Sequence, residues 1–111
     1  MTFQHHSAAS GGWFRFTLVE QMANIGSEVE RAISWKKKGR DDTAQAAFFR
    51  ALELLDLTIK GVGRDEGKLK ELCRCKEFFA DFFIGSNQYS QTNEMWQKYF
   101  YHFTYAVRLH R

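Results

Sequence analysis

The sequence contains no proline, two cysteines and no long apolar run. Because proline normally punctuates a chain with many turns, its absence argues against a sandwich or barrel and favours a few long helices. The longest apolar stretch, residues 78–84, is interrupted by Asp81 and falls far short of the ~20 residues of a transmembrane helix. Residues 1–12 are small and polar and lack the apolar segment of a signal peptide, so we expect no signal peptide. Because no apolar run is long enough to span a bilayer, we also expect no membrane partner.

The two cysteines, Cys73 and Cys75, lie two positions apart in a predicted helix. Their side chains then point ~200° apart, so they can neither pair with each other nor hold one metal ion together. Both are expected to be reduced, which favours a cytoplasmic location. Pairing of either thiol with His102 as a catalytic base would lack a strong electropositive activator.

Signatures of metal and haem sites are also missing: there is no Glu-x-x-His, no Cys-x-x-Cys and no His-Glu-x-x-His. The pair His5-His6 is interpreted as free tail histidines. We therefore expect no metal, no cofactor and no catalytic residues, and a non-enzymatic function is favoured over an enzymatic one.

The composition is that of a globular protein, with 44% hydrophobic and 26% charged residues in a chain of 111. This length suggests one domain. We assign residues 1–12, which end in Gly11-Gly12, to a flexible tail and residues 13–111 to a single domain. A net charge of +3 is too small to indicate nucleic-acid binding by itself.

Apolar residues recur at helical spacing in four segments, at about residues 16–38, 42–60, 66–84 and 92–109. Their short connections predict an all-α fold, an antiparallel up-and-down four-helix bundle. In the last two segments the expected inward residues are Leu69, Leu72, Cys73, Phe79, Ala80 and Phe83, then Met95, Tyr99, Phe103 and Ala106, widened by Trp96, Phe100 and Val107.

Several large apolar residues lie outside the inward stripes and would remain in water in a monomer. A contiguous apolar patch of this kind marks an interface, so we expect a homodimer or another protein partner. Alternatively, the first helix and the tail cover these side chains. The candidate interface residues are Phe49, Phe78, Phe82, Tyr101 and Tyr105, and Leu57 is also expected to point away from the core.

Polar residues at helical spacing follow one face of the first helix and one face of the third. They could form a polar groove between the two helices or two separate solvated faces with weak ion pairs. A partly buried Asp81 would need a partner, for which Arg74, Arg31 and an amide of the next loop are candidates. The candidate groove residues are Glu20, Asn24, Arg31, Arg74, Glu77 and Asp81.

A basic cluster at the end of the first helix is expected at the same end of the bundle as the loop 85–92. Together they could contact an anion or RNA, although Asp41 and Asp42 offset part of the charge. The alternative is a solvated helix end and a plain connector. The candidate contacts are Lys36, Lys37, Lys38, Arg40, Asn87 and Tyr89.

In size, helix order and aromatic content, residues 14–110 resemble the small bacterial four-helix proteins of the HEPN superfamily. Several of those accompany a minimal nucleotidyltransferase in toxin–antitoxin-like operons. HEPN ribonucleases carry an Arg followed four to six residues later by His, and this sequence has no such pair. The resemblance therefore implies a non-catalytic member that binds a partner or a nucleotide.

Three functions follow from these patterns. The first is an interaction module that dimerises or docks a protein partner, for which the resemblance suggests a nucleotidyltransferase-type protein. The second is an RNA- or nucleotide-binding protein that uses the basic cluster and the loop. The third is an enzyme with Glu20, Arg31, Glu77 and Asp81 facing inward.

Overall fold

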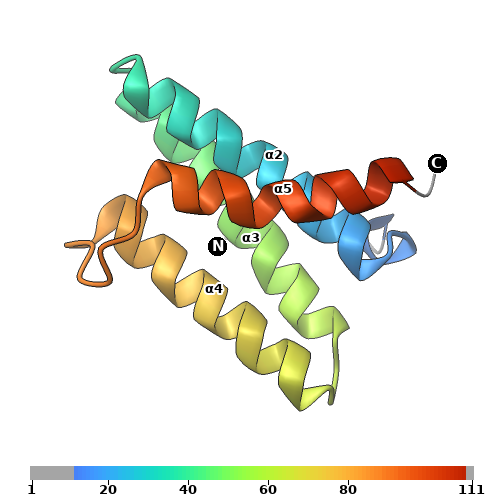
Figure 1. Ribbon diagram of the computed structural model, residues 1–111. Helices are drawn as coiled ribbons and strands as arrows, with labels where there is room; N and C mark the ends of the chain where they lie inside the picture. The colour runs from blue at the N-terminus through green and yellow to red at the C-terminus, as the bar shows by residue number, and fades with distance from the viewer. Residues whose placement is uncertain (1–11, 110–111) are drawn as a thin grey trace.

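The computed structural model describes residues 12–109, and within that range the chain is all-helical with no strand (Figure 1). This part of the prediction is confirmed, with small shifts at the helix ends. The predicted tail 1–12, apart from Gly12, lies outside the described residues, as do His5 and His6. The elements are a 3₁₀ turn, η1 (Gly12–Arg15), and the α-helices α2 (Leu18–Lys37), α3 (Asp41–Gly61), α4 (Glu66–Ile84) and α5 (Asn93–Leu109).

The first helix begins two residues later than predicted because Thr17 caps it. The Thr17 hydroxyl accepts from the Glu20 amide, and the Glu20 carboxylate accepts from the Thr17 amide, a reciprocal capping box. The preceding turn η1 was not predicted, because four residues are too few to show a helical period. Its buried Trp13 donates from Nε1 to Thr58 Oγ1 at 3.0 Å, which fastens η1 to α3.

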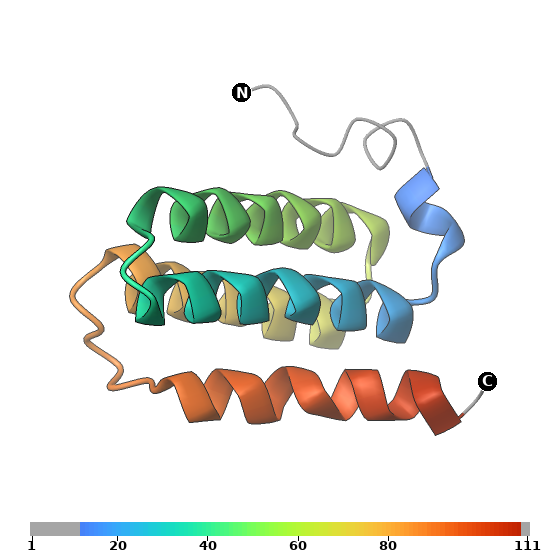
Figure 2. The ribbon, with the colours of Figure 1, turned by 90° about the horizontal axis from the view of Figure 1, so that it is seen from above.

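Helix α2 lies between α3 and α5, and α4 packs on α3 (Figure 2). Small side chains let the α2 and α3 backbones approach closely, since Ala32 of α2 and Ala47 and Ala51 of α3 are fully buried. On the other side of α2, a Cβ built on Gly26 would lie 2.7 Å from Phe100 Cβ. Glycine at this position therefore allows α5 to pack directly against α2.

Large rings connect α4 to its neighbours. Phe48 of α3 stacks on Phe83 of α4 with ring centroids 4.7 Å apart, and Phe79 meets Trp96 of α5 edge to face at 5.3 Å. Each pairing buries aromatic surface in a favoured geometry. The α4 and α5 helices thus join the core mainly through aromatic side chains.

The inward faces of α4 and α5 differ from the prediction. Cys75, not Cys73, is buried, and Met95 is exposed while Trp96 is buried. Where a helix has apolar residues on several sides, their spacing does not identify a single buried face. In α4 and α5 the packing of the large aromatic rings determines which side is buried. Leu57 was wrongly expected to point outward: it is buried because α3 packs against both α2 and α4.

Both cysteines are free thiols, Cys73 exposed and Cys75 buried. Among the described residues, no helix is both long enough and apolar enough to span a bilayer.

Candidate functional site

The outer face of α5 carries a stripe of exposed side chains. Glu94, Lys98, Tyr101, Tyr105 and Arg108 follow one another at steps of four and three residues, the spacing of a single helix face. This face lies opposite the buried α5 residues. We call these five side chains the α5 stripe.

Two tyrosines form the centre of the α5 stripe. Tyr101 and Tyr105 are 56% and 50% exposed, and their rings stack with centroids 6.1 Å apart at an interplanar angle of 25°. Met95 and Leu109, which flank the stripe at its two ends, are also exposed. An exposed aromatic pair with apolar neighbours is more typical of a binding surface than of a solvated helix face.

Two cavities lie along the seam between α2 and α5 beside the stripe. One cavity of about 420 Å³ includes Glu30, Trp96, Phe100 and Tyr101 in its walls. A second cavity of about 330 Å³ extends toward Phe16 and Arg108. The two cavities lie next to each other, since Ser27 and Thr104 line both, and each includes a residue of the α5 stripe, Tyr101 or Arg108.

The structure divides the predicted polar groove between two places. Glu20 and Asn24 line the second cavity between α2 and α5. Arg74 lines a separate cavity of about 260 Å³ between α4 and α5. Of the two alternatives drawn from the sequence, these positions fit separate faces better than one shared groove, because α2 packs closely on α3 and α5 while α4 packs on α3.

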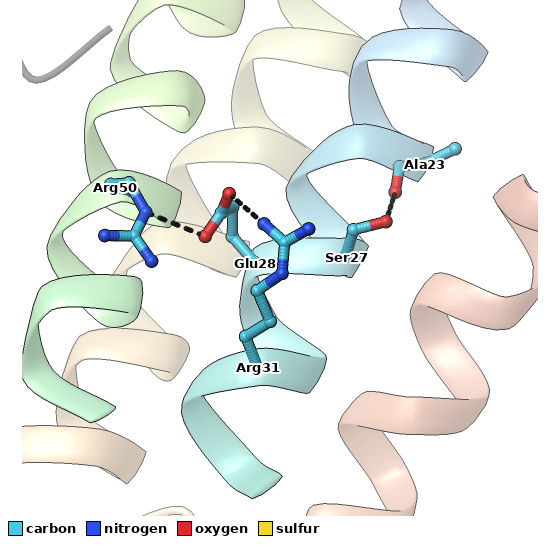
Figure 3. Close-up of polar contacts among 5 residues, drawn as sticks. All are labelled: Ala23, Ser27, Glu28, Arg31 and Arg50. Carbon is cyan, nitrogen blue, oxygen red and sulfur yellow. Dashed lines mark hydrogen bonds and ion pairs between the residues drawn. The ribbon is translucent and has the colours of Figure 1, made fainter. Parts of the chain in front are cut away.

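A buried carboxylate that the prediction missed joins α2 to α3 (Figure 3). The Glu28 side chain is 9% exposed and accepts from Arg31 Nη1 at 2.8 Å and from Arg50 Nε at 3.0 Å. Glu28 follows Ile25 by three residues, so it falls on the inward face of α2, and this register could have identified it. The predicted groove residue Arg31 is thus engaged in an ion pair within its own helix.

Asp81 is half-buried, as predicted, but its carboxylate lacks the predicted partner. Its Oδ2 atom is buried with no hydrogen-bond partner among the described residues. The loop amides of Gly85 and Asn87 donate instead to the Asp81 backbone carbonyl, at 3.0 and 3.2 Å. The amides that follow Ile84, the last residue of α4, thus turn back onto the Asp81 carbonyl.

Two polar side chains of the loop 85–92, Asn87 and Tyr89, already have hydrogen-bond partners. Asn87 Nδ2 donates to the Gln91 carbonyl and Asn87 Oδ1 accepts from the Gln91 amide, both at 2.9 Å. Tyr89 donates to Glu77 Oε1 at 3.1 Å, and this hydrogen bond raises the pKa of the tyrosine. Asn87, a predicted anion contact, therefore already forms hydrogen bonds within the loop. Glu77, a predicted groove residue, already accepts a hydrogen bond from Tyr89.

Two residues of the predicted interface are partly covered. Phe78 stacks beneath Tyr89 at 4.2 Å, and Phe82 packs against Trp96 at 6.3 Å. Both are half-buried against the core, because the loop and α5 cover the side of α4 that a simple stripe leaves open. Phe49, by contrast, remains exposed on α3.

Three of the four cations of the basic cluster lie over aromatic rings. Lys36 Nζ reaches the Phe83 carbonyl at 3.5 Å and lies 4.7 Å from the centre of the Phe83 ring. Lys38 and Arg40 lie over Trp35, at 5.0 and 5.5 Å. The last turn of α2 thus touches the last turn of α4, so the cluster and the loop 85–92 share one end of the molecule, as predicted (Figure 2).

The buried thiol has the wrong environment for a nucleophile. Burial raises the pKa of Cys75 to about 12, and the nearby Glu71 carboxylate acts in the same direction. Tyr99 donates to Glu71 Oε1 at 3.3 Å, and burial also raises the pKa of this tyrosine. His102, the base considered from the sequence, is exposed. Cys75 therefore remains a protonated, buried side chain at neutral pH.

In residues 12–109 no three His, Cys, Asp or Glu side chains come together as a metal site would require. The chain matches no protein-family profile, no curated protein and no solved structure.

Proposed function

We propose that this protein is a non-enzymatic helical interaction module that binds another protein through the α5 stripe. The observation that carries the proposal is the stacked, half-exposed pair Tyr101 and Tyr105 on the helix face opposite the core. Tyrosine and arginine are among the side chains that contribute most to binding at protein interfaces. The stripe contains both, and Met95 and Leu109 add apolar surface at its ends.

Support for a non-enzymatic role comes from the titratable groups that the chain uses internally. Glu28 is held by two arginines, Glu77 accepts from Tyr89, and burial keeps the Cys75 thiol protonated. Cys75 lines the cavity between α4 and α5 beside Glu71 and Arg74, but burial keeps its thiol protonated at neutral pH, so it is not poised as a nucleophile.

The bundle proposed here is antiparallel and up-and-down. Residues 38–40 and 62–65 are the connections between α2, α3 and α4, and they are too short to return the chain to the starting end of a long helix. A cytoplasmic location remains a prediction that rests on the two free thiols. The HEPN-like resemblance likewise remains a prediction, and a nucleotidyltransferase-type partner would follow from it.

The test is native mass spectrometry of the untagged protein purified from its own host. The wild type is compared with a Tyr101→Ala, Tyr105→Ala double variant and with Phe49→Ala, which removes an exposed ring from α3 instead. We expect a protein complex in the wild type and in Phe49→Ala, and its loss in the double variant. A wild type that is monomeric and unaccompanied, or a complex that survives in the double variant, would contradict the proposal.

A second candidate function is RNA or nucleotide binding by the basic cluster. It is supported by the exposed Lys37, Lys38 and Arg40 beside Trp35, which combine positive charge with an aromatic surface. This function predicts an affinity for single-stranded RNA that falls steeply with salt and falls further in Lys37→Ala, Lys38→Ala. RNA binding that is absent at low salt, or unchanged in that variant, would rule it out.

A further inference from the structure

The charge pattern of the α5 stripe specifies a partner. We infer that the α5 stripe binds a second copy of this chain, with the two α5 helices antiparallel around a two-fold axis at Tyr101. This inference rests on the proposed function, because it names the occupant of the same surface. It goes further in fixing which residues meet across the interface.

The two end charges of the stripe are opposite in sign and equally far from its centre. Glu94 and Arg108 each lie seven residues from Tyr101, a spacing of two helical turns on the same face. Neither side chain forms an ion pair or a side-chain hydrogen bond within residues 12–109. Both charges are therefore available to a partner.

An antiparallel pairing centred on Tyr101 satisfies both charges at once. Two-fold symmetry brings Tyr101 against its own copy and places Glu94 of each chain beside Arg108 of the other. Lys98 comes close to Tyr105 of the second copy, where its ammonium can lie over the tyrosine ring. Every charged member of the stripe then has a complementary neighbour.

Two other arrangements of the same helices bring like charges together. A parallel pairing sets Glu94, Lys98 and Arg108 each against its own copy. An antiparallel pairing centred between Tyr101 and Tyr105 places Lys98 beside Arg108 of the second copy, since both lie five residues from that centre. Like charges placed directly opposite each other disfavour a pairing, so the order of charges in the stripe favours the centre at Tyr101 over these two arrangements.

A charge-exchange experiment tests the pairing. In Glu94→Arg or Arg108→Glu, each of the two symmetric ion pairs becomes a repulsion, and we expect the dimer dissociation constant to rise about tenfold or more at low salt. In the double variant Glu94→Arg, Arg108→Glu the pairs form again with their signs reversed, and dimerisation should return close to the wild-type level. Failure of the double variant to recover would overturn the inferred register.

Disulfide trapping tests the same geometry without altering charge, in a Cys73→Ser background that removes the exposed thiol. In Tyr101→Cys the new thiol lies on the axis and should form a disulfide-linked dimer under mild oxidation. Tyr105→Cys is the matched control: Tyr105 is exposed to a similar extent, but the new thiol would lie about 12 Å along the helix from its own copy and should not cross-link. The reverse result, cross-linking at Tyr105 and not at Tyr101, would contradict the inference.

Failure of this inference and failure of the proposed function give different results. If the wild type dimerises but Tyr105→Cys, and not Tyr101→Cys, cross-links, the register centred on Tyr101 is overturned. The same holds if the wild type dimerises but the double charge variant does not. Either result keeps α5 as the binding face. A wild type that stays monomeric alone, but is bound to a different protein in its own host through Tyr101 and Tyr105, overturns self-association and keeps the proposed function. Loss of both self-association and any Tyr101-dependent complex overturns the two together.

Discussion

The first two α-helices and the last two contribute to this molecule in different ways. Helices α2 and α3 bury eight and nine residues, whereas α4 and α5 bury four and two. The α2–α3 contact is built from alanines and aliphatic side chains and is fastened by the buried Glu28. The α4 and α5 helices join it mainly through large rings and keep broad outer faces in water.

This difference distinguishes the side chains that stabilise the fold, mostly in α2 and α3, from the exposed side chains of α5 that can contact a partner. Side chains such as Phe48, Ala47 and Ala51 in α3 are fully occupied by the core. The α5 helix needs Trp96 and Phe100 for its attachment, so its opposite face is free to carry the α5 stripe. Substitutions in α2 and α3 should therefore act mainly on stability, and substitutions in the stripe mainly on association.

The largest effect on stability is expected at Phe48, a fully buried ring of α3 that contacts Phe79 and Phe83. Phe48→Ala should lower the free energy of unfolding by about 3–5 kcal/mol, the range for truncating a buried aromatic side chain. Phe82→Ala, at a half-buried ring of α4, should cost clearly less. Urea denaturation of both variants measures this, and equal losses would contradict the distinction between the two helix pairs.

The contact between α2 and α5 depends on a glycine. Gly26→Ala would place a Cβ 2.7 Å from Phe100 Cβ, which forces α5 outward and should destabilise the protein by about 1–3 kcal/mol before the helix propensity of alanine offsets part of the loss. Gly67→Ala in α4 meets nothing closer than 3.7 Å and should gain up to about 1 kcal/mol from propensity alone. In thermal unfolding, Gly26→Ala should lower the melting temperature and Gly67→Ala should raise it. A shift in the same direction for both variants would mean that α5 does not pack on Gly26.

The buried Glu28 is expected to contribute less than the aromatic core. Glu28→Gln removes a charge that accepts from two arginines, and we expect a loss of about 1–2 kcal/mol because Arg50 is 30% exposed and partly solvated. Glu77→Gln, whose hydrogen bond to Tyr89 is exposed, should change stability by less than about 0.5 kcal/mol. Chemical denaturation at low and high salt measures both, and equal effects would show that Glu28 is no more important than a surface carboxylate.

The smallest effect near neutral pH involves Cys75. Its pKa is raised from 9.0 to about 12, so folding favours the protonated thiol. This contribution is complete below pH 9 and is lost as the pH rises toward 12. We expect stability to fall over that interval less steeply in Cys75→Ala than in Cys73→Ser, and at pH 8 a thiol reagent should label Cys73 far faster than Cys75. Rapid labelling of Cys75 would contradict its burial.

The sequence predicts the helices better than it predicts their faces. The four helical segments follow from the spacing of apolar residues, and in α2 the apolar residues from Met22 to Ile33 lie in the core. In α4, apolar residues occupy several sides, so Cys73 and Cys75 exchange places relative to the prediction. Periodicity identifies one face only where the other faces are polar.

The sequence pattern does not predict contacts between segments that are far apart in the chain. The Trp13–Thr58 hydrogen bond and the Glu28–Arg50 ion pair depend on how η1 and α3 dock, which no local pattern records. The division of the predicted polar groove has the same cause, because the packing order of the helices decides which polar faces meet. The exposure of Tyr101 and Tyr105, by contrast, follows directly from their position on the helix.

The most direct test of the central claim is sedimentation velocity of the purified wild type over a wide concentration range, beside the Tyr101→Ala, Tyr105→Ala double variant. We predict a wild-type sedimentation coefficient that rises with concentration from the monomer to the dimer value, and a double variant that stays monomeric with unchanged thermal stability. A wild type that remains monomeric at every concentration, or a double variant that dimerises equally well, would contradict the assignment of the α5 stripe as a self-association surface.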